Sequence, residues 1–388
     1  MRTHNRYFSH ITPFTKIEKM SVIKKYKAPR MIQGRHFTFN IKYGKFIKPM
    51  EKIVSKYNTE TSKYFGKGDY DTQARKIRKL ATKYRYYTEC DHTSFDAHVT
   101  MEHLEMTHKF YKACIPKEYH AELTELMNKT KNNKCYSRNG ESYKIKGTRM
   151  SGDVDTGFGN CLINYAILKD GLERLNMEGE VIVNGDDSII FTNKPINTAD
   201  FNRIMRDYNM ESKAQESVKN INTVEFCRTK LVTNYEGQDT MMMDPDRLVD
   251  IYGMEYKITK APKYHKYLLE TATCNAIINA NNPVGYIWGK HFNIDTVGYI
   301  KDETKFDKMF EELEIIEKDK MLKLANFKPE RTTTGEITPS MITAYPQILE
   351  YDNKIKSLAE KVIKHNYVFK SSTPNIIINH DTQTATQY

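Results

Sequence analysis

The stretch Glu180-Val-Ile-Val-Asn184-Gly185-Asp186-Asp187-Ser188-Ile-Ile-Phe191 decides the fold of this chain. Two short β-branched runs flank a four-residue turn, and Asn-Gly is a strong signal for a hairpin turn. The hairpin therefore carries two adjacent carboxylates at its tip. Neighbouring carboxylates repel each other, so this arrangement is costly unless a cation lies beside it. Gly-Asp-Asp is also an ordinary solvated turn, and the rest of the sequence has to decide between the two interpretations.

Composition points to a folded protein with a polyanionic partner. The chain has 388 residues, enough for two or three lobes, and 39% of them are hydrophobic. The formal net charge of +11 favours nucleic acid or an anionic membrane surface as partner. This excess is local, because residues 1–56 hold 14 Lys and Arg against two acidic residues, a net +12, which leaves −1 for the remainder.

Several function classes are excluded by what the motifs lack. The six Cys form no Cys-x-x-Cys pair, so the sequence predicts neither a zinc site nor a disulfide framework and favours a reducing compartment. No apolar run reaches about 18 residues, and the basic N-terminus has no apolar core, so neither a membrane span nor a signal peptide is expected. Gly66-Lys-Gly68 lacks the spacing of a phosphate-binding P-loop. A calcium loop starting at Asp153 is rejected because its twelfth position is Asn164, not Glu.

The order of the other polar motifs favours the interpretation of the hairpin as a cation site. A predicted strand ends at Asp91, Asp96 follows after a turn, and a helix begins near Val99. The Gly-rich, hydroxyl-rich stretch 144–160 then leads into an apolar helix, where a backbone or a ribose can approach closely. If the strand ending at Asp91 lies beside the hairpin, three carboxylates converge. That is the ligand set for two divalent cations about 3.5–4 Å apart, which promote in-line phosphoryl transfer.

The remaining segments are predicted from periodicity and breakers. Pro29 keeps Ala28 extended, so residues 24–35 are expected to form a strand or loop whose cations line a channel for triphosphates or RNA. Residues 114–143 are expected to be irregular, 209–217 to form a turn region carrying Lys213, 224–232 to form a hairpin, and the last twenty or so residues to form a loose tail. Helices are expected over 43–57, 73–83, 160–172, 198–208, 262–280 and 302–325.

In this order the motifs resemble those of the RNA-dependent RNA polymerases of positive-strand RNA viruses, most closely the tombusvirus-like group. The resemblance runs from about residue 14 to 232. Residues 91–98, 149–160 and 184–187 resemble the three palm motifs of that family. Residues 28–33 resemble its triphosphate-binding fingers motif, and 224–228 its primer-grip hairpin. Five motifs in the right order are far more specific than any one of them.

The resemblance implies roles for individual residues. Asp91 and Asp186, supported by Asp187, would ligate Mg²⁺ or Mn²⁺. Asp96 and Asn160 would read the ribose 2′-hydroxyl, the group that distinguishes RNA substrates. Lys213 is either the general acid that protonates pyrophosphate or an ordinary surface lysine. The full nucleotide-binding set is Lys27, Arg30, Asp96, Ser151, Gly152, Thr156 and Asn160, and the RNA-binding set is Lys24, Lys25, Arg35 and Arg228. Asp155 stands where relatives often carry Asn, which leaves its role open.

The implied fold is α+β, a right-hand polymerase whose palm is a small antiparallel sheet with helices, with fingers and a helical thumb. The similarity is loose after Val232, where residues 265–292 are expected to form a thumb hairpin. The expected domains are 1–84 fingers, 85–115 palm, 116–147 a fingers insertion, 148–235 palm, 236–365 thumb and 366–388 a flexible tail.

The implied function is template-directed RNA synthesis that replicates a positive-strand viral genome. Template, product and nucleoside triphosphates would be the partners, within a membrane-associated replication complex in the host cytoplasm. Two alternatives are a catalytically silent RNA-binding palm subunit and a reverse transcriptase. The crowded carboxylates argue against the first. Gly185 before the Asp pair and the polar pair of Asp96 and Asn160 argue against the second.

The short N-terminal region raises a separate expectation. In the family a substantial fingers region precedes the triphosphate motif, which begins here only about two dozen residues into the sequence. We therefore expect this chain to be part of a longer polymerase, either a frameshift or readthrough product cut short or one half of a split enzyme whose partner supplies the remaining fingers. An upstream-encoded replicase segment or a membrane-anchoring replication protein would then be a partner. A compact polymerase that dispenses with those fingers is the alternative.

Overall fold

The computed structural model describes residues 8–19, 28–56, 63–255, 261–294, 335–365, 376–378 and 385–387. The predicted mixture of helices and small sheets is confirmed, so the fold class is α+β. The chain divides into two compact units, which we describe separately. The first comprises residues 1–16, 29–68 and 75–227, and the second comprises 17–28, 69–74 and 228–388.

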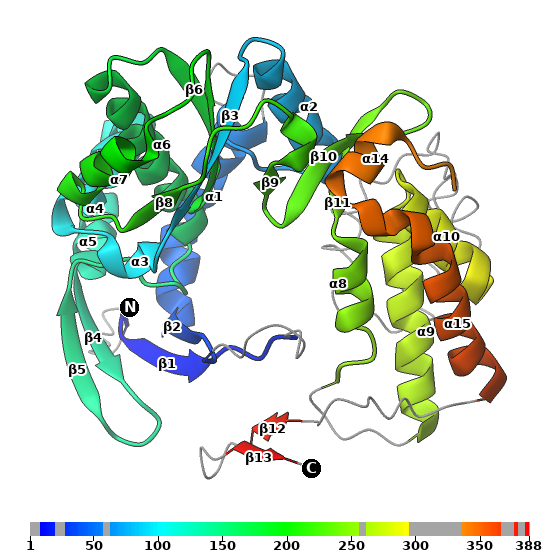
Figure 1. Ribbon diagram of the computed structural model, residues 1–388. Helices are drawn as coiled ribbons and strands as arrows, with labels where there is room; N and C mark the ends of the chain where they lie inside the picture. Colours follow the sequence, from blue (N-terminus) through cyan, green and yellow to red (C-terminus); the bar gives the residue numbers. More distant parts are fainter. Residues whose placement is uncertain are drawn as a thin grey trace. The chain divides into compact units, whose positions relative to one another are not determined.

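A four-stranded antiparallel sheet lies at the centre of the first unit (Figure 1). Its spatial order is β6-β7-β3-β8, and the predicted hairpin forms its β6–β7 pair. Residues 188–192 of β7 are all buried, which explains why this strand consists of β-branched and aromatic residues around one serine. The strands are β3 (Tyr86–His92), β6 (Gly179–Asn184), β7 (Asp187–Thr192) and β8 (Ser212–Ala214).

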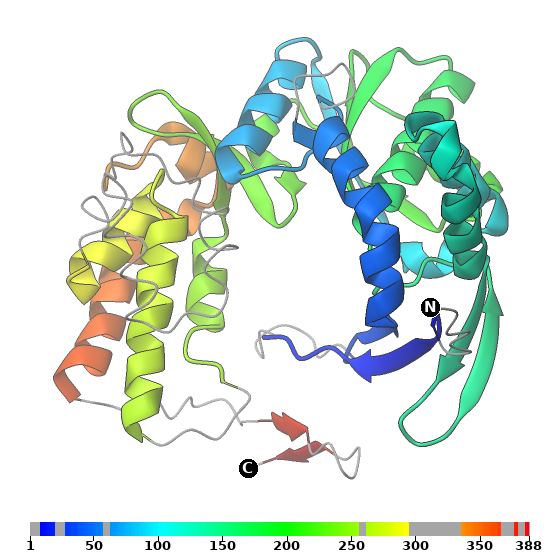
Figure 2. The ribbon, with the colours of Figure 1, turned by 180° about the vertical axis from the view of Figure 1, so that it is seen from behind.

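Helix α6 (Thr156–Arg174) packs on this sheet and on two further helices. Gly171 permits a close approach, because a Cβ there would lie 2.6 Å from the Met205 side chain of α7. Helix α4 packs against the core through a buried face that includes Leu104, Thr107 and Tyr111. The other helices of the first unit are α1 (Phe37–Lys56, visible in Figure 2), α3 (Phe95–His98), α4 (Met101–Cys114), α5 (His120–Lys131) and α7 (Thr198–Asp207), while α2 (Tyr70–Ala81) crosses the boundary between the units.

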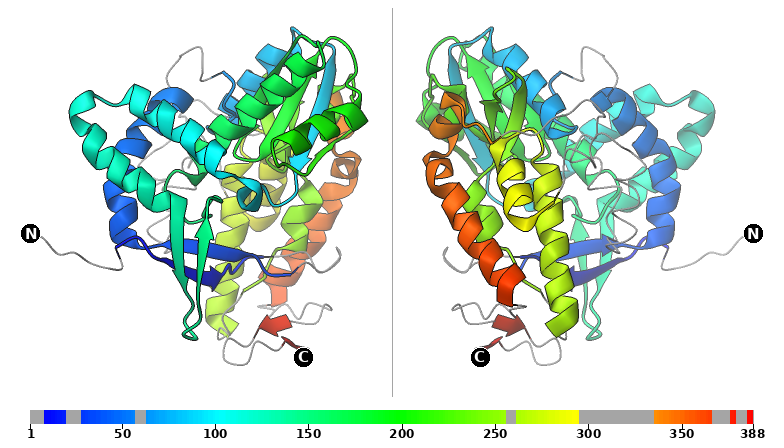
Figure 3. Two further views of the ribbon diagram at one scale, coloured as in Figure 1. Left: turned by 90° about the vertical axis from the view of Figure 1, so that its left-hand side faces the viewer. Right: turned by 90° about the vertical axis from the view of Figure 1, so that its right-hand side faces the viewer.

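A second sheet of the first unit corrects one prediction. Its order is β2-β1-β4-β5, and the β4–β5 hairpin extends away from α4 and α5 (Figure 3). Residues 114–143 were expected to be irregular, yet they contain α5 and β4. Leu123, Leu126 and Met127 form the buried face of α5, a three-four spacing that the polar composition of this segment obscures. The strands are β1 (Ile11–Thr15), β2 (Met31–Arg35), β4 (Asn132–Tyr136) and β5 (Ser142–Lys146).

The second unit is mainly helical around its own core. Trp288 lies fully buried in that core, where its Nε1 donates a 2.8 Å hydrogen bond to the Tyr351 hydroxyl. The predicted helix at 262–280 is confirmed as α9, whereas the one at 302–325 lies outside the described residues. The elements are β10 (Thr229–Thr233), β11 (Asp239–Met243), α8 (Pro245–Asp250), α9 (Ala261–Ile278), α10 (Pro283–Phe292), α14 (Pro339–Ala344) and α15 (Tyr351–His365).

Two further predictions concern short strands. The expected hairpin at 224–232 contains β9 (Glu225–Phe226) and β10, separated by Cys227 and Arg228, whose φ angles of 52° and 62° are those of a tight hairpin turn. Within the expected loose tail, the described residues form a short antiparallel pair, β12 (Ile376–Ile378) with β13 (Ala385–Gln387), and the isoleucine run favours the strand β12. In the described part of the chain, every helix is too short or too polar to cross a membrane.

Candidate active site

The tip of the β6–β7 hairpin is a two-residue loop. Asn184 pairs with Asp187, which leaves Gly185 and Asp186 between them. Gly185 has a φ of 66°, and a Cβ at this position would have nothing within 4 Å of it, so the backbone conformation alone favours glycine. Glycine with positive φ at this loop position matches the twist of the flanking strands. The Asp186 carboxylate is consequently exposed at the end of the sheet. We call residues 184–187 the catalytic turn, after the role that we propose for them.

Strand β3 brings Asp91 to the same end of the sheet. β3 pairs antiparallel with β7, and the pairing reaches Glu89 opposite Ile189. Beyond this pair the Ser188 hydroxyl donates to the Cys90 carbonyl at 2.9 Å, so Asp91 follows directly at the end of the sheet that carries the turn. The prediction that these two strands lie side by side is therefore confirmed.

Side chains of helix α6 form hydrogen bonds with the backbone of the catalytic turn. Asn164 donates from Nδ2 to the backbone carbonyls of Gly185 at 3.1 Å and Asp186 at 3.2 Å. The Gly185 N–H donates to the Cys161 sulfur at 3.1 Å. Burial raises the pKa of the Cys161 thiol, so the thiol stays neutral and acts here as a weak acceptor. These contacts fix the backbone of the turn without using its carboxylates.

His92 extends this support to the neighbouring strands. Because the Asn164 amide nitrogen donates to the turn, its Oδ1 is left to accept from His92 Nε2, 3.0 Å away. His92 Nδ1 then accepts from the Ser212 hydroxyl of β8 at 2.8 Å. Burial lowers the pKa of His92, which favours the neutral ring that this arrangement requires. Through these hydrogen bonds His92 links β3, α6 and β8 to the catalytic turn.

The sequence interpretation assigned no role to His92, Cys161 or Asn164. One signal was available: Asn160 and Asn164 stand four residues apart, on one face of an otherwise apolar helix. Two buried amides on such a helix need partners. Nothing in the sequence indicates that Cys161 accepts a hydrogen bond from the turn.

Lys213 lies next to Asp91 across β8 and β3. The two residues are direct partners in the antiparallel pair, so their side chains extend from the same face of the sheet. Lys213 is exposed on the short strand β8, within a segment predicted to be a turn. An exposed ammonium beside a carboxylate suits an ion pair as well as a proton donor, so both alternatives for Lys213 stay open.

The predicted pairing of Asp96 and Asn160 is present. Asn160 Nδ2 donates to Asp96 Oδ1 at 2.7 Å, and Asn160 Oδ1 accepts from Arg149 Nε at 3.2 Å. Burial raises the pKa of Asp96, while the Asn160 hydrogen bond and the nearby Arg149 charge act in the opposite direction. The pair joins the segment after β3 to the first turns of α6, 64 residues away.

Asp155, whose role the sequence left open, is the centre of a buried polar group. Its Oδ2 accepts from Arg149 Nη1 at 2.9 Å and from the hydroxyls of Tyr43 at 3.3 Å and Tyr111 at 3.2 Å. The side chains of Asp155 and Arg149 are 0% and 1% exposed. Asp155 therefore neutralises a buried guanidinium and cannot reach a substrate from this position.

Ser151 and Gly152 form a loop that is joined to strand β2. The Gln33 N–H donates to Ser151 Oγ at 2.9 Å, and the Gly152 N–H donates to the Gln33 carbonyl at 3.0 Å. A Cβ on Gly152 would lie 2.5 Å from that carbonyl, which explains the glycine. Asn40 of α1 also holds this loop, because its side-chain amide donates to the Gly152 carbonyl at 3.0 Å. Thr156 donates to a backbone carbonyl within the same loop.

Arg35 corrects the predicted RNA-binding set. Its side chain is fully buried, and its Nε and Nη2 donate to the two carboxylate oxygens of Asp153 at 2.5 and 2.9 Å. Nη2 also donates to Asn133 Oδ1 at 2.6 Å. Nη1 donates to the carbonyls of Ser9 at 2.9 Å and Lys129 at 3.3 Å, so this guanidinium is committed to acceptors of the protein itself and is not available to RNA. Together Arg35, Arg149, Asp153 and Asp155 form what we call the buried arginine cluster.

The other predicted cations are exposed or fall outside the described residues. Arg30 and Arg228 are exposed, one beside β2 in the first unit and one in the turn after β9. Lys24, Lys25 and Lys27 lie outside the described residues.

The donor chemistry at the sheet end fits a hard divalent cation. Asp91 and Asp186 are exposed and Asp187 is half-buried, and carboxylate oxygens are the ligands that Mg²⁺ takes in proteins. Within the described ranges, no three His, Cys, Asp or Glu side chains come close enough together to enclose a metal ion. The structure thus brings the carboxylates to one edge but does not gather all three around one point.

Comparison with known proteins identifies relatives of this arrangement. The sequence pattern of the family described as "Viral RNA dependent RNA polymerase" matches residues 2–339. The RNA-directed RNA polymerase of Groundnut rosette virus (strain MC1) is 30% identical over 258 residues, which cover 63% of this chain and 30% of that protein. The RNA-directed RNA polymerase of Tobacco necrosis virus (strain A) is 28% identical over 289 residues, covering 70% and 39%. The chain thus spans less than half the length of these relatives.

Proposed function

Because the chain belongs to the viral RNA dependent RNA polymerase family, we propose that it catalyses template-directed RNA synthesis from ribonucleoside triphosphates. The observation that carries the proposal is the register of β3 and β7, which brings Asp91 to the end of the sheet where the catalytic turn exposes Asp186. The proposal includes replication of a positive-strand viral genome in the host cytoplasm, in a membrane-associated complex.

Asp91 and Asp186, supported by Asp187, would hold Mg²⁺ or Mn²⁺. When bound, such ions neutralise the triphosphate and lower the pKa of an attacking hydroxyl. The chain's own part is to hold these carboxylates at fixed positions while leaving them accessible. The hydrogen bonds from Asn164 to the backbone of the turn support this role, because they orient the turn without neutralising Asp186.

Asp96 and Asn160 are proposed to select the ribose. A 2′-hydroxyl is both donor and acceptor. The Asp96 carboxylate keeps an oxygen that can accept from this hydroxyl, while the Asn160 amide holds the carboxylate in position. Arg30, exposed beside β2, would contact the triphosphate, and Lys213 would protonate the pyrophosphate that leaves. Ser151, Gly152 and Thr156 would act through the loop that they build rather than by direct contact.

The right-hand division follows from the same proposal. The β6-β7-β3-β8 sheet with α6 would be the palm, and the β2-β1-β4-β5 sheet with α1 would belong to the fingers. The helical second unit from Arg228 onward would be the thumb.

The test is nucleotide incorporation by the purified chain on a homopolymer RNA template, with radiolabelled NTP or dNTP as substrate. We expect template-dependent incorporation of the complementary NTP that is abolished by EDTA and restored by Mg²⁺ or Mn²⁺. Equal use of dNTP would support a reverse transcriptase instead. RNA binding without incorporation of either substrate, also after addition of the upstream-encoded segment, would support a catalytically silent subunit.

A further inference from the structure

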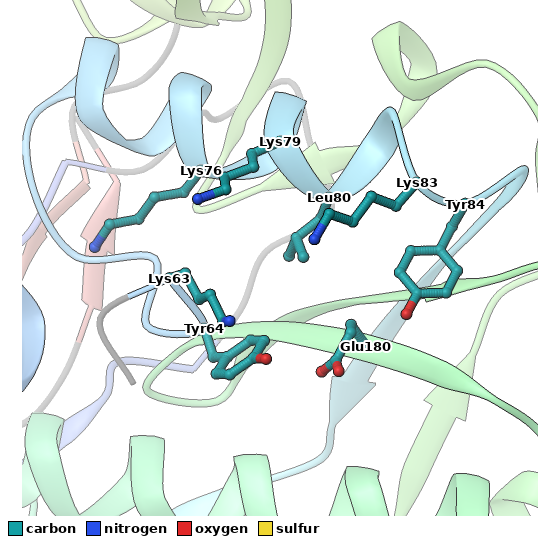
Figure 4. A pocket seen from close by; sticks show the side chains of 8 residues that line it. All are labelled: Lys63, Tyr64, Lys76, Lys79, Leu80, Lys83, Tyr84 and Glu180. Carbon is teal, nitrogen blue, oxygen red and sulfur yellow. The ribbon is translucent and has the colours of Figure 1, made fainter. Parts of the chain in front are cut away.

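A small pocket opens on the first unit between helix α2 and strand β6 (Figure 4). Its cavity volume is about 70 Å³, which is room for a phosphate-sized group rather than for a whole nucleobase. Lys79, Leu80 and Lys83 line it from the α2 side, Glu180 from the strand side, and Lys63 and Tyr64 from the segment before Phe65. None of these residues belongs to the site described above.

The lining carries an excess of positive charge. Lys63, Lys79 and Lys83 contribute ammonium groups, and Glu180 is the single carboxylate among the lining residues. Glu180 is already shared with Lys169, whose Nζ lies 3.3 Å from it. In the part of the chain that the structure describes, Lys79 and Lys83 form no ion pair. Several ammonium groups around one cavity repel each other, so a bound anion would stabilise the arrangement.

Lys76 has a different role in the same pocket wall. Its ammonium donates to the backbone carbonyls of Phe65 at 2.7 Å, Ser55 at 3.0 Å and Lys67 at 3.2 Å. Those three bonds use all three of its donors. Lys76 therefore fixes the segment that carries Lys63 and Tyr64, while Lys79 and Lys83 are left to face a ligand.

The pocket lies at the opposite end of the hairpin from the catalytic turn. Glu180 is the second residue of β6 and Asn184 the last, so about 13 Å of strand separates them at about 3.3 Å per residue. A ligand in this pocket would thus be bound away from the exposed carboxylates.

We propose that this pocket binds a phosphate of single-stranded RNA, with the adjoining ribose outside the cavity beside Glu180, at a second site outside the catalytic centre. Lys63, Lys79 and Lys83 provide point charges for a phosphate group. The Glu180 carboxylate provides an acceptor for a ribose 2′-hydroxyl. Tyr64 and Tyr84 also line the pocket, and aromatic rings beside a cationic groove are typical of sequence-tolerant contacts with single strands.

A membrane surface is a poorer match for the same charges. Peripheral binding to anionic lipid combines basic residues with exposed apolar side chains that enter the headgroup region. Here the aliphatic lining residue, Leu80, is 4% exposed. The acceptor group of Glu180 also has no use against a phosphate-rich surface, whereas it suits a ribose hydroxyl.

The test uses the full chain carrying Asp186→Asn, so that catalysis cannot alter the probe. A ten-nucleotide oligouridylate containing 4-thiouridine is photocrosslinked and the modified peptides are mapped by mass spectrometry. We expect crosslinks in the peptides that contain Tyr64 or Tyr84. The double variant K79A/K83A should lose them, and K79R/K83R should keep them. The matched control K109A/K117A removes two exposed lysines elsewhere on the first unit and should leave them unchanged.

The salt dependence of RNA binding gives a quantitative test of the same proposal. Each phosphate contact to a single strand contributes about 0.7 to the slope of log K against log salt, so K79A/K83A should reduce that slope by about 1.4 relative to K109A/K117A. Unchanged crosslinks and an unchanged slope in K79A/K83A would overturn the proposal. So would Lys79- and Lys83-dependent binding to phosphoinositide vesicles without binding to RNA. Equal affinity for the matching oligodeoxynucleotide would overturn the role of Glu180. None of these outcomes depends on polymerase activity.

Discussion

Two groups of aspartates in the first unit have the same chemistry and opposite surroundings. Asp91 and Asp186 at the end of the sheet are exposed. Asp153 and Asp155 are 7% and 0% exposed, and each is paired with an arginine of the buried arginine cluster. A carboxylate that is neutralised inside the protein stabilises the fold, and a carboxylate that is held open to solvent is available for a cation. The position of an aspartate in the fold, rather than its residue type, decides whether it stabilises the structure or is available to bind a cation.

The comparison is tested most severely by removing one exposed carboxylate. Asp186→Asn should leave the fold intact and reduce nucleotide incorporation by about a thousandfold or more, because loss of a metal ligand costs several kcal/mol of transition-state stabilisation. Single-nucleotide extension measures the effect, and circular dichroism checks the fold. Asp200→Asn is the matched control, since Asp200 is a partly exposed aspartate of α7 whose ion pair with Arg203 lies on the surface. More than about a tenth of the activity in Asp186→Asn would contradict the assignment.

A substitution in the buried arginine cluster should mainly lower the stability of the fold. Arg149→Met leaves Asp155 without its counter-charge, and breaking a buried pair by removing one partner costs about 3–5 kcal/mol. We expect the free energy of unfolding of the first unit to fall by that amount, measured as faster amide hydrogen exchange in α6. Arg203→Met, which removes an exposed guanidinium, should change it by less than about 1 kcal/mol. Equal effects of the two substitutions would show that the buried pair adds nothing to stability.

The sequence distinguishes these two groups only in part. The hairpin and the strand ending at Asp91 follow from β-branched runs and turn residues, which are local signals, and they are confirmed. The partners of Asp153 and Asp155 are not local. Arg35 lies 118 residues from Asp153, so no spacing rule connects them, and the basic composition around Arg35 suggested RNA binding instead. The Gly-rich loop containing Asp153 was expected to let a backbone or a ribose approach closely, and the backbone of β2 does approach it, with a further contact from α1.

A histidine near the buried arginine cluster makes the fold sensitive to acid. Burial lowers the pKa of His108 to about 4, with Asp155 and Arg149 acting on it in opposite directions. An unfolded histidine has a pKa of about 6.5, so between pH 6.5 and 4 the unfolded chain binds a proton that the folded chain does not. Stability therefore falls as the pH drops through this window, by about 2–3 kcal/mol from this residue.

His108→Gln should remove that part of the acid sensitivity. The measurement is the urea midpoint of unfolding at pH 7 and at pH 5, compared between the two proteins. The difference between the two pH values should be smaller in the variant. His120→Gln is the control, since that ring is half-exposed and its Nε2 donates to the Ile115 carbonyl at 2.8 Å. The same pH dependence in wild type and His108→Gln would mean that His108 is not buried in its neutral form.

The smallest expected effect concerns the residue that touches both groups. Asn160 accepts from Arg149 of the buried cluster and donates to Asp96, the carboxylate proposed to select the ribose. Asn160→Ala should lower the preference for NTP over dNTP by about tenfold, the equivalent of about 1.4 kcal/mol, because Asp96 loses the amide that orients it. Asn164→Ala, one helical turn further on, removes the support of the catalytic turn instead. It should slow incorporation of both substrates to a similar extent and leave their ratio unchanged. Single-nucleotide extension with each substrate gives both ratios from one set of rates. If Asn160→Ala slows both substrates equally, as Asn164→Ala is expected to do, then Asn160 belongs to the structural group alone and Asp96 does not read the sugar.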